Sequence, residues 1–238
     1  IAVRQTKDAL RFSAVVSAVA GASDLPVVLM PSDTAGLKAA LPGVKDRRPL
    51  IYGVSKDNFT EFAAVAKEYN LPVVACALDI EGLSSLTREL NKAGVEDILL
   101  DTGKKKMTDK LWDLTQLRRL ALKKSERSLG FPSCVVVENE DPYEEAFEAA
   151  TYILKYAGLV LMENIQNWQV YSLLTLRQNI YTDPQKPLQI ESKLYEIGHV
   201  TDKSPVLVTT NFSLSYFTVL GEVEGSKIPA YILPVDTE

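Results

Sequence analysis

Apolar, β-branched runs alternate along the chain with amphipathic segments, and this repeat constrains the fold more than any other feature. The intervals between the runs are close to 25 residues, apart from one longer interval before Ser133. The runs are apolar throughout, which is typical of parallel strands buried on both faces. The pattern predicts βα units that start near Ile1, Pro26, Pro49, Pro72, Asp97, Ser133 and Gly158.

The segments between the runs show helical periodicity. Apolar residues recur at i, i+3, i+4 and i+7, with charged residues between them. Asp33 and Asp57 occupy expected N-cap positions, and Gly94 and Gly158 occupy expected helix ends. Three apolar stripes carry the prediction: Phe12, Val15, Val16 and Val19; Phe59, Phe62, Ala63 and Ala66; Leu83, Leu86, Leu90 and Ala93.

The number of units favours an α/β fold of the (β/α)₈, TIM-barrel type for residues 1–181, closed by a helix from about Gln166 to Tyr181. A doubly wound open sheet is the alternative, but neither GxGxxG nor GxxxxGK[ST] occurs. Seven units are visible, whereas a barrel needs eight. We therefore expect the first βα unit to precede Ile1.

The pattern changes after Tyr181. Residues 182–204 hold two prolines within four residues at their start and are expected to form a linker, with a short helix from Glu191 to Ile197. A strand (Pro205 to Thr209), a helix (Ser213 to Glu224) and a strand (Pro229 to Asp236) should follow. Residues 205–238 are therefore predicted to be the first β-α-β unit of a second α/β domain.

Composition excludes several classes of function. The net charge of −5 argues against nucleic-acid binding, and no apolar run reaches the roughly 20 residues that span a bilayer. Cys76 and Cys134 lie in separate apolar runs, and the sequence has a single histidine, His199. These residues do not make up the ligand set of a metal site. We expect reduced, buried thiols, a cytoplasmic protein, and no metal site in this chain.

Polar residues at the expected carboxyl ends of the strands are the barrel's candidate site residues. Asp101-Thr102-Gly103 either orients a ligand or forms a turn, and the turn is favoured. Lys104, Lys105 and Lys106 are expected in a solvated loop. No nucleophile–base pair is apparent, so no catalytic residue is predicted. The candidates are Arg4, Asp33, Ser55, Asp79, Asp101, Glu138 and Glu163.

A cluster of hydroxyl residues marks the second domain. Thr209, Thr210, Ser213 and Ser215 fall where a strand passes into a helix, which is where ligands bind in open α/β folds. Hydroxyls and free helix N–H groups suit the amides and phosphate of a large cofactor. The other interpretation is a simple N-cap by Asn211 or Ser213, and chemistry alone leaves both open.

The stretch from Arg177 to Glu238 includes LRQNIYTDPQKPLQIESKLYEIGHV and VTTNFSLSYFTVLGEVEGSKIPAYILPVDTE. It resembles the large (gamma) subunits of corrinoid/iron–sulfur proteins, from the carbon monoxide dehydrogenase/acetyl-CoA synthase system. The likeness extends back through LTQLRRLALKKSERSLGFP and RRPLIYGV to the whole chain. It implies a carrier that passes a methyl group from methyl-tetrahydropterin through corrinoid cobalt to acetyl-CoA synthase, in carbon fixation by the Wood–Ljungdahl pathway.

The resemblance also implies cofactors, partners and residues. Thr209 and Ser215 match the corrinoid contacts, although Thr is common at the second position. The four cysteines of a [4Fe–4S] cluster have no counterpart here. The implied partners are a small subunit forming a heterodimer, carbon monoxide dehydrogenase/acetyl-CoA synthase, and a methyl-tetrahydropterin methyltransferase. The chain would be a methyltransferase component whose barrel is not itself catalytic. A pterin-binding barrel methyltransferase, with Asp101 holding the pterin, and a non-catalytic scaffold barrel are the alternatives.

Overall fold

The computed structural model describes residues 1–181 and 188–236, and for residues 179–181 only the backbone. They divide into two compact units, Ile1–Arg177 and Gln178–Glu238. Within the described part of the chain, no helix is both long and apolar enough to cross a bilayer.

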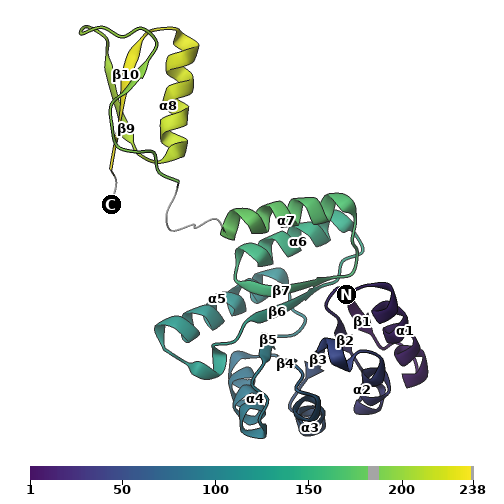
Figure 1. Ribbon diagram of the computed structural model, residues 1–238. Helices are drawn as coiled ribbons and strands as arrows, with labels where there is room; N and C mark the ends of the chain where they lie inside the picture. The colour runs from purple at the N-terminus through teal and green to yellow at the C-terminus, as the bar shows by residue number, and fades with distance from the viewer. Residues whose placement is uncertain (182–187, 237–238) are drawn as a thin grey trace. The chain divides into compact units, whose positions relative to one another are not determined.

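The first unit is a curled, seven-stranded parallel sheet whose strands follow one another in chain order (Figure 1). All seven predicted strands are present, and every neighbouring pair is parallel. This confirms the α/β fold and its barrel-like curl. The strands are β1 (Ala2–Arg4), β2 (Val28–Met30), β3 (Leu50–Val54), β4 (Val73–Cys76), β5 (Ile98–Asp101), β6 (Ser133–Val137) and β7 (Ala157–Met162).

Helices connect the strands and cover the outer face of the sheet (Figure 1). Asp33 caps the second of them, as predicted, by accepting a hydrogen bond from the Gly36 N–H at 2.6 Å. Gly94, with φ +88°, ends the fourth. The helices are α1 (Ala9–Ala22), α2 (Thr34–Ala40), α3 (Phe59–Tyr69), α4 (Ile80–Ala93), α5 (Met107–Lys123), α6 (Pro142–Leu154) and α7 (Asn167–Tyr181).

Two of the expected helix boundaries are wrong. The N-cap of α3 is Asn58 rather than Asp57, and the Asn58 side chain holds the preceding turn by accepting a hydrogen bond from the Ser55 N–H at 2.8 Å. Gly158 does not end α6, because the helix stops at Leu154 and Gly158 lies in β7. A side chain at Gly158 would approach the Ser133 carbonyl oxygen to 3.2 Å, so glycine serves close strand packing there.

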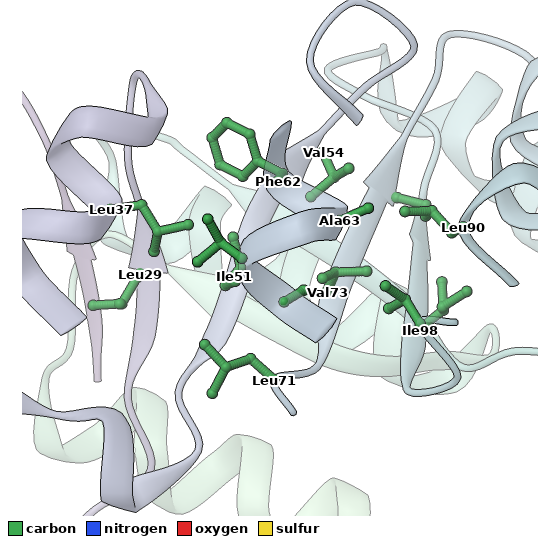
Figure 2. Close-up of a cluster of buried hydrophobic side chains, with 14 of the residues drawn as sticks. Leu29, Leu37, Ile51, Val54, Phe62, Ala63, Leu71, Val73, Leu90 and Ile98 are labelled. Carbon is green, nitrogen blue, oxygen red and sulfur yellow. The ribbon is translucent and has the colours of Figure 1, made fainter. Parts of the chain in front are cut away.

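Both faces of the sheet are buried, which explains why the strands do not alternate in polarity. On the outer face Leu29, Ile51 and Val73 pack against the helices, as Figure 2 shows for the region around α3. On the inner face Val74 and Cys134 belong to a separate apolar cluster inside the curl. The core therefore has the two layers expected of a barrel wall.

Over residues 188–236, the second unit is a three-stranded sheet with one helix. Strands β9 (Val206–Thr210) and β10 (Ala230–Val235) are parallel and joined by α8 (Ser213–Ser226), as predicted. A short strand, β8 (Tyr195–Ile197), pairs antiparallel with β10. The core of this unit is built around Tyr216, Val223, Ala230 and Ile232.

The helix expected over Glu191–Ile197 is therefore wrong, because Tyr195 and Ile197 pack in the second core from a strand. Strand β8 falls inside the stretch expected to be a linker, so the folded unit includes residues before Pro205. Gln189 also forms a bridge with Phe212. The beginning of the expected linker, residues 182–187, lies outside the described residues.

Candidate functional site

The carboxyl ends of the first unit's strands surround a cavity of about 620 Å³. Its lining runs from Arg4 at the end of β1 to Glu138 beyond the end of β6, and includes Tyr52, Asp101 and Lys110. A cavity of this size is typical of small-molecule sites, and in barrels this end of the strands carries the ligands. The sequence candidates Arg4, Asp101 and Glu138 are thus brought together.

Asp101, at the end of β5, is the centre of a buried polar network. Its side chain is 2% exposed, and Oδ1 accepts a hydrogen bond from Lys110 Nζ at 2.7 Å. Oδ2 accepts a second from the Tyr52 hydroxyl at 2.6 Å. The Gly103 N–H donates a third to Oδ1 at 3.0 Å. Since both carboxylate oxygens are engaged, the geometry favours a structural role for Asp101 over the pterin-holding alternative.

The turn after Asp101 depends on glycine. Gly103 adopts φ +73°, a left-handed conformation that strains other residues. This conformation directs the Gly103 N–H back to Asp101. The favoured interpretation, in which Asp101-Thr102-Gly103 forms a turn, agrees with this geometry. Thr102 Oγ1 is buried beside the turn and has no hydrogen-bond partner among the residues that the structure describes.

Two residues of this network, Tyr52 and Lys110, were not predicted from the sequence, and Lys110 is the charged one. It lies on α5, is 4% exposed, and falls on the buried stripe with Asp113, Leu114 and Leu117. The signal was available, because these residues follow i, i+3, i+4 and i+7 spacing. A lysine on such a stripe needs a buried partner, and the nearest preceding strand end supplies Asp101.

A second group of charges lies at the rim of the cavity. Arg4 pairs with Glu138, and Lys104 Nζ lies 3.3 Å from the same carboxylate. The hydrogen bond from Arg4 is the main reason that the pKa of Glu138 is lowered. Lys105 pairs with Asp113 at 2.5 Å and is 22% exposed, so the lysine run is only partly the solvated loop that we expected.

The apolar cluster on the inner face of the sheet contains two cysteines, Cys76 and Cys134, and both thiols are un-ionised. Burial, followed by the nearby Asp101 carboxylate, raises the pKa of Cys76 to about 12 and that of Cys134 further. The same two causes raise the pKa of Tyr52. These groups are therefore neutral at physiological pH, and they are unsuited to nucleophilic or metal-binding roles there.

The remaining barrel candidates serve the fold. Asp33 and Asp79 are helix N-caps. Ser55 takes part through its backbone in the turn before α3. Glu163 is held after β7 by its N–H, which donates to the fully buried Glu145 at 2.6 Å. None of these four side chains lines the cavity.

In the second unit, Thr209 and Ser215 lie at the junction of β9 with α8. Within residues 1–181 and 188–236, the structure gives neither hydroxyl a hydrogen-bond partner. The Oγ1 atom of the adjacent Thr210 is buried and also unpaired. Among the described residues, the fold therefore leaves the hydroxyls of Thr209, Thr210 and Ser215 without a hydrogen-bond partner.

Neither of the residues proposed as a simple N-cap, Asn211 and Ser213, caps α8. The N-cap of α8 is Phe212, which provides no side-chain hydrogen bond. Asn211 is buried and donates to Asp236 Oδ1 at 3.0 Å, which ties the junction to the end of β10. The Ser213 N–H donates to the Leu188 carbonyl at 2.7 Å. Capping therefore does not account for the hydroxyl cluster.

Metal binding finds no support in the described ranges. No group of three or more His, Cys, Asp or Glu side chains there is arranged to hold an ion. His199 is exposed beyond β8, as expected for a surface residue. A [4Fe–4S] cluster uses four cysteine thiolates, and the sequence contains two cysteines. The residues of this chain do not fit such a cluster.

Comparison with known proteins identifies relatives that match most or all of this chain. The family model described as CO dehydrogenase/acetyl-CoA synthase delta subunit matches residues 1–238. The chain is 43% identical to the corrinoid/iron–sulfur protein large subunit of Moorella thermoacetica, covering 100% of this chain and 54% of that protein. It is 36% identical to the acetyl-CoA decarbonylase/synthase complex subunit gamma of Methanothermobacter thermautotrophicus, covering 90% and 50%. The chain thus spans about half the length of these relatives.

Solved structures show the same fold at low identity. The dihydropteroate synthase of Xanthomonas albilineans superposes with a TM-score of 0.60 at 18% identity, over 77% of this chain and 80% of that one. The enzyme from Vibrio fischeri gives 0.58 at 13%, over 77% and 82%. These likenesses establish the barrel-type architecture of the first unit.

Proposed function

Because the chain belongs to the CO dehydrogenase/acetyl-CoA synthase delta subunit family, we propose that it is part of the methyl-carrying large subunit of a corrinoid/iron–sulfur protein. In this proposal the subunit accepts a methyl group from methyl-tetrahydropterin and delivers it to acetyl-CoA synthase. The corrinoid, when bound, supplies the cobalt that carries the methyl group. The protein's own contribution is to hold and position the cofactor.

The observation that carries the proposal is the hydroxyl cluster at the β9–α8 junction. Thr209, Thr210 and Ser215 have hydroxyls that the described fold does not use, and the junction lies at the carboxyl end of a parallel strand. Hydroxyls and helix N–H groups can bond the amide and phosphate groups of a corrinoid without charged residues. We assign Thr209 and Ser215 as its contacts in this chain.

The assignment extends to the domains. We propose that residues 1–181 form the greater part of a (β/α)₈ barrel, with one further βα unit of the longer protein closing it between β7 and β1, the outer strands of the sheet. The second unit is the beginning of the corrinoid-binding domain. A barrel whose buried charges are mutually paired serves as scaffold and docking surface rather than as a catalyst.

An absorbance spectrum of the purified full-length protein tests the proposal. Corrinoid bands in the visible region that change on reduction and on methylation are expected. A full-length protein that shows no corrinoid bands after reconstitution with cobalamin would refute it. Turnover of methyl-tetrahydropterin by the barrel without a partner would instead support the enzyme alternative.

A further inference from the structure

The cavity at the carboxyl ends of the first unit's strands has a positively charged lining, which the proposed carrier function does not use. Five cationic side chains and three carboxylates line it, in a chain whose net charge is −5. A hollow lined by an excess of one charge attracts ions of the other. The cations are Arg4, Lys104, Lys105, Lys106 and Lys110, and the carboxylates are Asp101, Glu138 and Glu148.

The three carboxylates already accept hydrogen bonds from the protein. Asp101 has the three donors described above, and Glu138 accepts a hydrogen bond from Arg4. Glu148 accepts one from the Tyr152 hydroxyl at 2.6 Å. A ligand that presents N–H donors, as a pterin ring does, would find these acceptors occupied. The lining instead favours a ligand that is negatively charged and accepts hydrogen bonds.

Two of the lysines retain unused donors. An ammonium carries three N–H groups, and among the described residues Lys110 Nζ has one acceptor, Asp101 Oδ1. Because this side chain is 4% exposed, its other donors depend on acceptors inside the cavity. Lys106 is exposed at the rim, and its ammonium has no partner within residues 1–181 and 188–236.

Helix α5 adds positive potential at the same place. Its N-cap is Lys106, which makes no side-chain hydrogen bond, and its first residue, Met107, lines the cavity. The N–H groups of Met107 and Thr108 have no acceptor in the part of the chain that the structure describes. Such a helix start carries a partial positive charge and binds anions. The lysine at the N-cap increases this charge, and a bound anion would offset it.

The backbone of β3 leaves room for a ligand. The pairing of β3 with β4 shifts register between Ile51 and Val54, and Gly53 has φ +95° there. A Cβ at Gly53 would have no atom within 4 Å, so close packing is not the reason for the bare backbone. Gly53 lines the cavity. The irregularity therefore enlarges the ligand space, as bulges beside binding sites commonly do.

The residues that carry this argument lie away from the outer strands of the sheet. Tyr52 and Gly53 belong to β3, and Asp101 ends β5. Strands β2 and β6 separate them from β1 and β7. Lys106 and Lys110 follow β5 in the chain. A further βα unit between β7 and β1 would leave this side of the cavity as it is.

We propose that the cavity binds a small molecule that carries a phosphate or carboxylate group. Lys106, Lys110 and the N-terminus of α5 hold the anionic group. The uncharged part of the ligand contacts the apolar lining, which includes Met30, Met107 and Val136. The inference goes beyond the proposed function, because it gives the barrel a ligand of its own and does not involve the corrinoid.

The test titrates the full-length protein with inorganic phosphate and, separately, with succinate, at an ionic strength held constant with sodium chloride. Calorimetry should find one saturable site for at least one probe. Lys106→Gln should raise its dissociation constant about tenfold, the effect of losing one charge-assisted hydrogen bond. Lys106→Arg keeps the charge and should restore most of the affinity.

Lys123→Gln is the matched control, because Lys123 is also exposed and lies at the other end of α5. It is roughly 25 Å from Lys106 along the helix, beyond the Debye length, so the dissociation constant should change less than about twofold. Circular dichroism checks that the variants are folded. Equal dissociation constants for the Lys106→Gln and Lys123→Gln variants would overturn the inference, and so would the absence of saturable binding of both probes.

Lysine acetylation with peptide mapping gives a mutation-free readout on the wild-type protein. The probe that binds should protect Lys104 and Lys106 and leave Lys123 reactive, whereas equal protection of all three would identify adventitious binding and refute the site. Tighter binding of phosphate would assign a phosphorylated ligand, and tighter binding of succinate a carboxylated one. Corrinoid absorbance of the same samples separates the two proposals: corrinoid without an anion site refutes this inference alone, and an anion site without corrinoid refutes the proposed function alone.

Discussion

Lys110 Nζ donates a hydrogen bond to Asp101 Oδ1 at 2.7 Å, and both side chains are almost fully shielded from solvent. The ammonium comes from α5 and the carboxylate from the end of β5. The pair therefore fastens a helix to the mouth of the curled sheet. Breaking such a pair from one side leaves an uncompensated buried charge, which costs more than the pair itself contributes.

We predict that Lys110→Met destabilises the first unit by about 3–5 kcal/mol, because Asp101 loses its neutralising partner. The double variant Asp101→Asn/Lys110→Met should recover much of this loss. Urea unfolding followed by circular dichroism measures both. Lys104→Met is the control, since Lys104 is 85% exposed. Equal stability of the Lys110 and Lys104 variants would contradict the role of the pair.

The ion pair between Arg4 and Glu138 predicts an acid-dependent contribution to stability. The pKa of Glu138 is lowered from 4.5, mainly by the hydrogen bond from Arg4. The contribution is therefore complete above about pH 4.5 and is lost as the pH falls through the lower folded-state pKa. Its size is at most about 1 kcal/mol for a partly exposed pair.

Glu138→Gln should remove this contribution. The difference in unfolding free energy between wild type and variant should be largest at neutral pH and shrink below about pH 4.5. Glu140→Gln, at an exposed neighbouring position, provides the control. A difference that stayed constant down to pH 3 would argue against the ion pair as its source.

Cys76 and Cys134 are expected to resist alkylation in the folded protein. With the pKa of Cys76 raised to about 12, roughly one thiol in ten thousand is ionised at pH 8, and Cys134 is 1% exposed. Iodoacetamide labelling with peptide mapping should find both unmodified in buffer and modified in urea. Rapid native labelling of Cys134 would show that the inner cluster is open.

Thr209→Val should weaken corrinoid retention by the full-length protein about 5-fold, the effect of losing one hydrogen bond of about 1 kcal/mol. Ser215→Ala should act in the same direction. The control is Thr218→Val on the same helix, whose hydroxyl already donates to the Leu214 carbonyl at 2.8 Å. Cofactor content after gel filtration provides the measurement, and equal retention in the Thr209 and Thr218 variants would remove Thr209 from the site.

The sequence predicted the seven strands and most helices because each is a local pattern long enough to be recognised. It failed for β8, because three residues carry little periodicity and Tyr195 is positioned by pairing with β10, more than 30 residues later. Lys110 was missed for a related reason. Its place on the buried stripe of α5 can be read from the spacing, but its pairing with Asp101 depends on how α5 packs on β5, which the local pattern does not determine.

For the hydroxyl cluster, the position could be predicted from the sequence but the role could not. Sequence placed Thr209 and Ser215 at a strand-to-helix junction correctly, but it could not decide between capping and ligand binding. The structure excludes a side-chain cap, because the N-cap position of α8 is taken by Phe212, and ligand binding by the hydroxyls stays a proposal. Cap geometry depends on backbone angles at single residues, which periodicity does not determine.

The strictly sequential strand order of the first unit bears on how the chain is made. Each strand pairs with the one synthesised just before it, so the sheet can lengthen one βα unit at a time as the polypeptide leaves the ribosome, with short loops to close. The ion pair of Arg4 with Glu138 joins residues 134 apart and can form only after β6 has been added. It is a late contact, and its loss should speed unfolding while leaving the folding rate nearly unchanged.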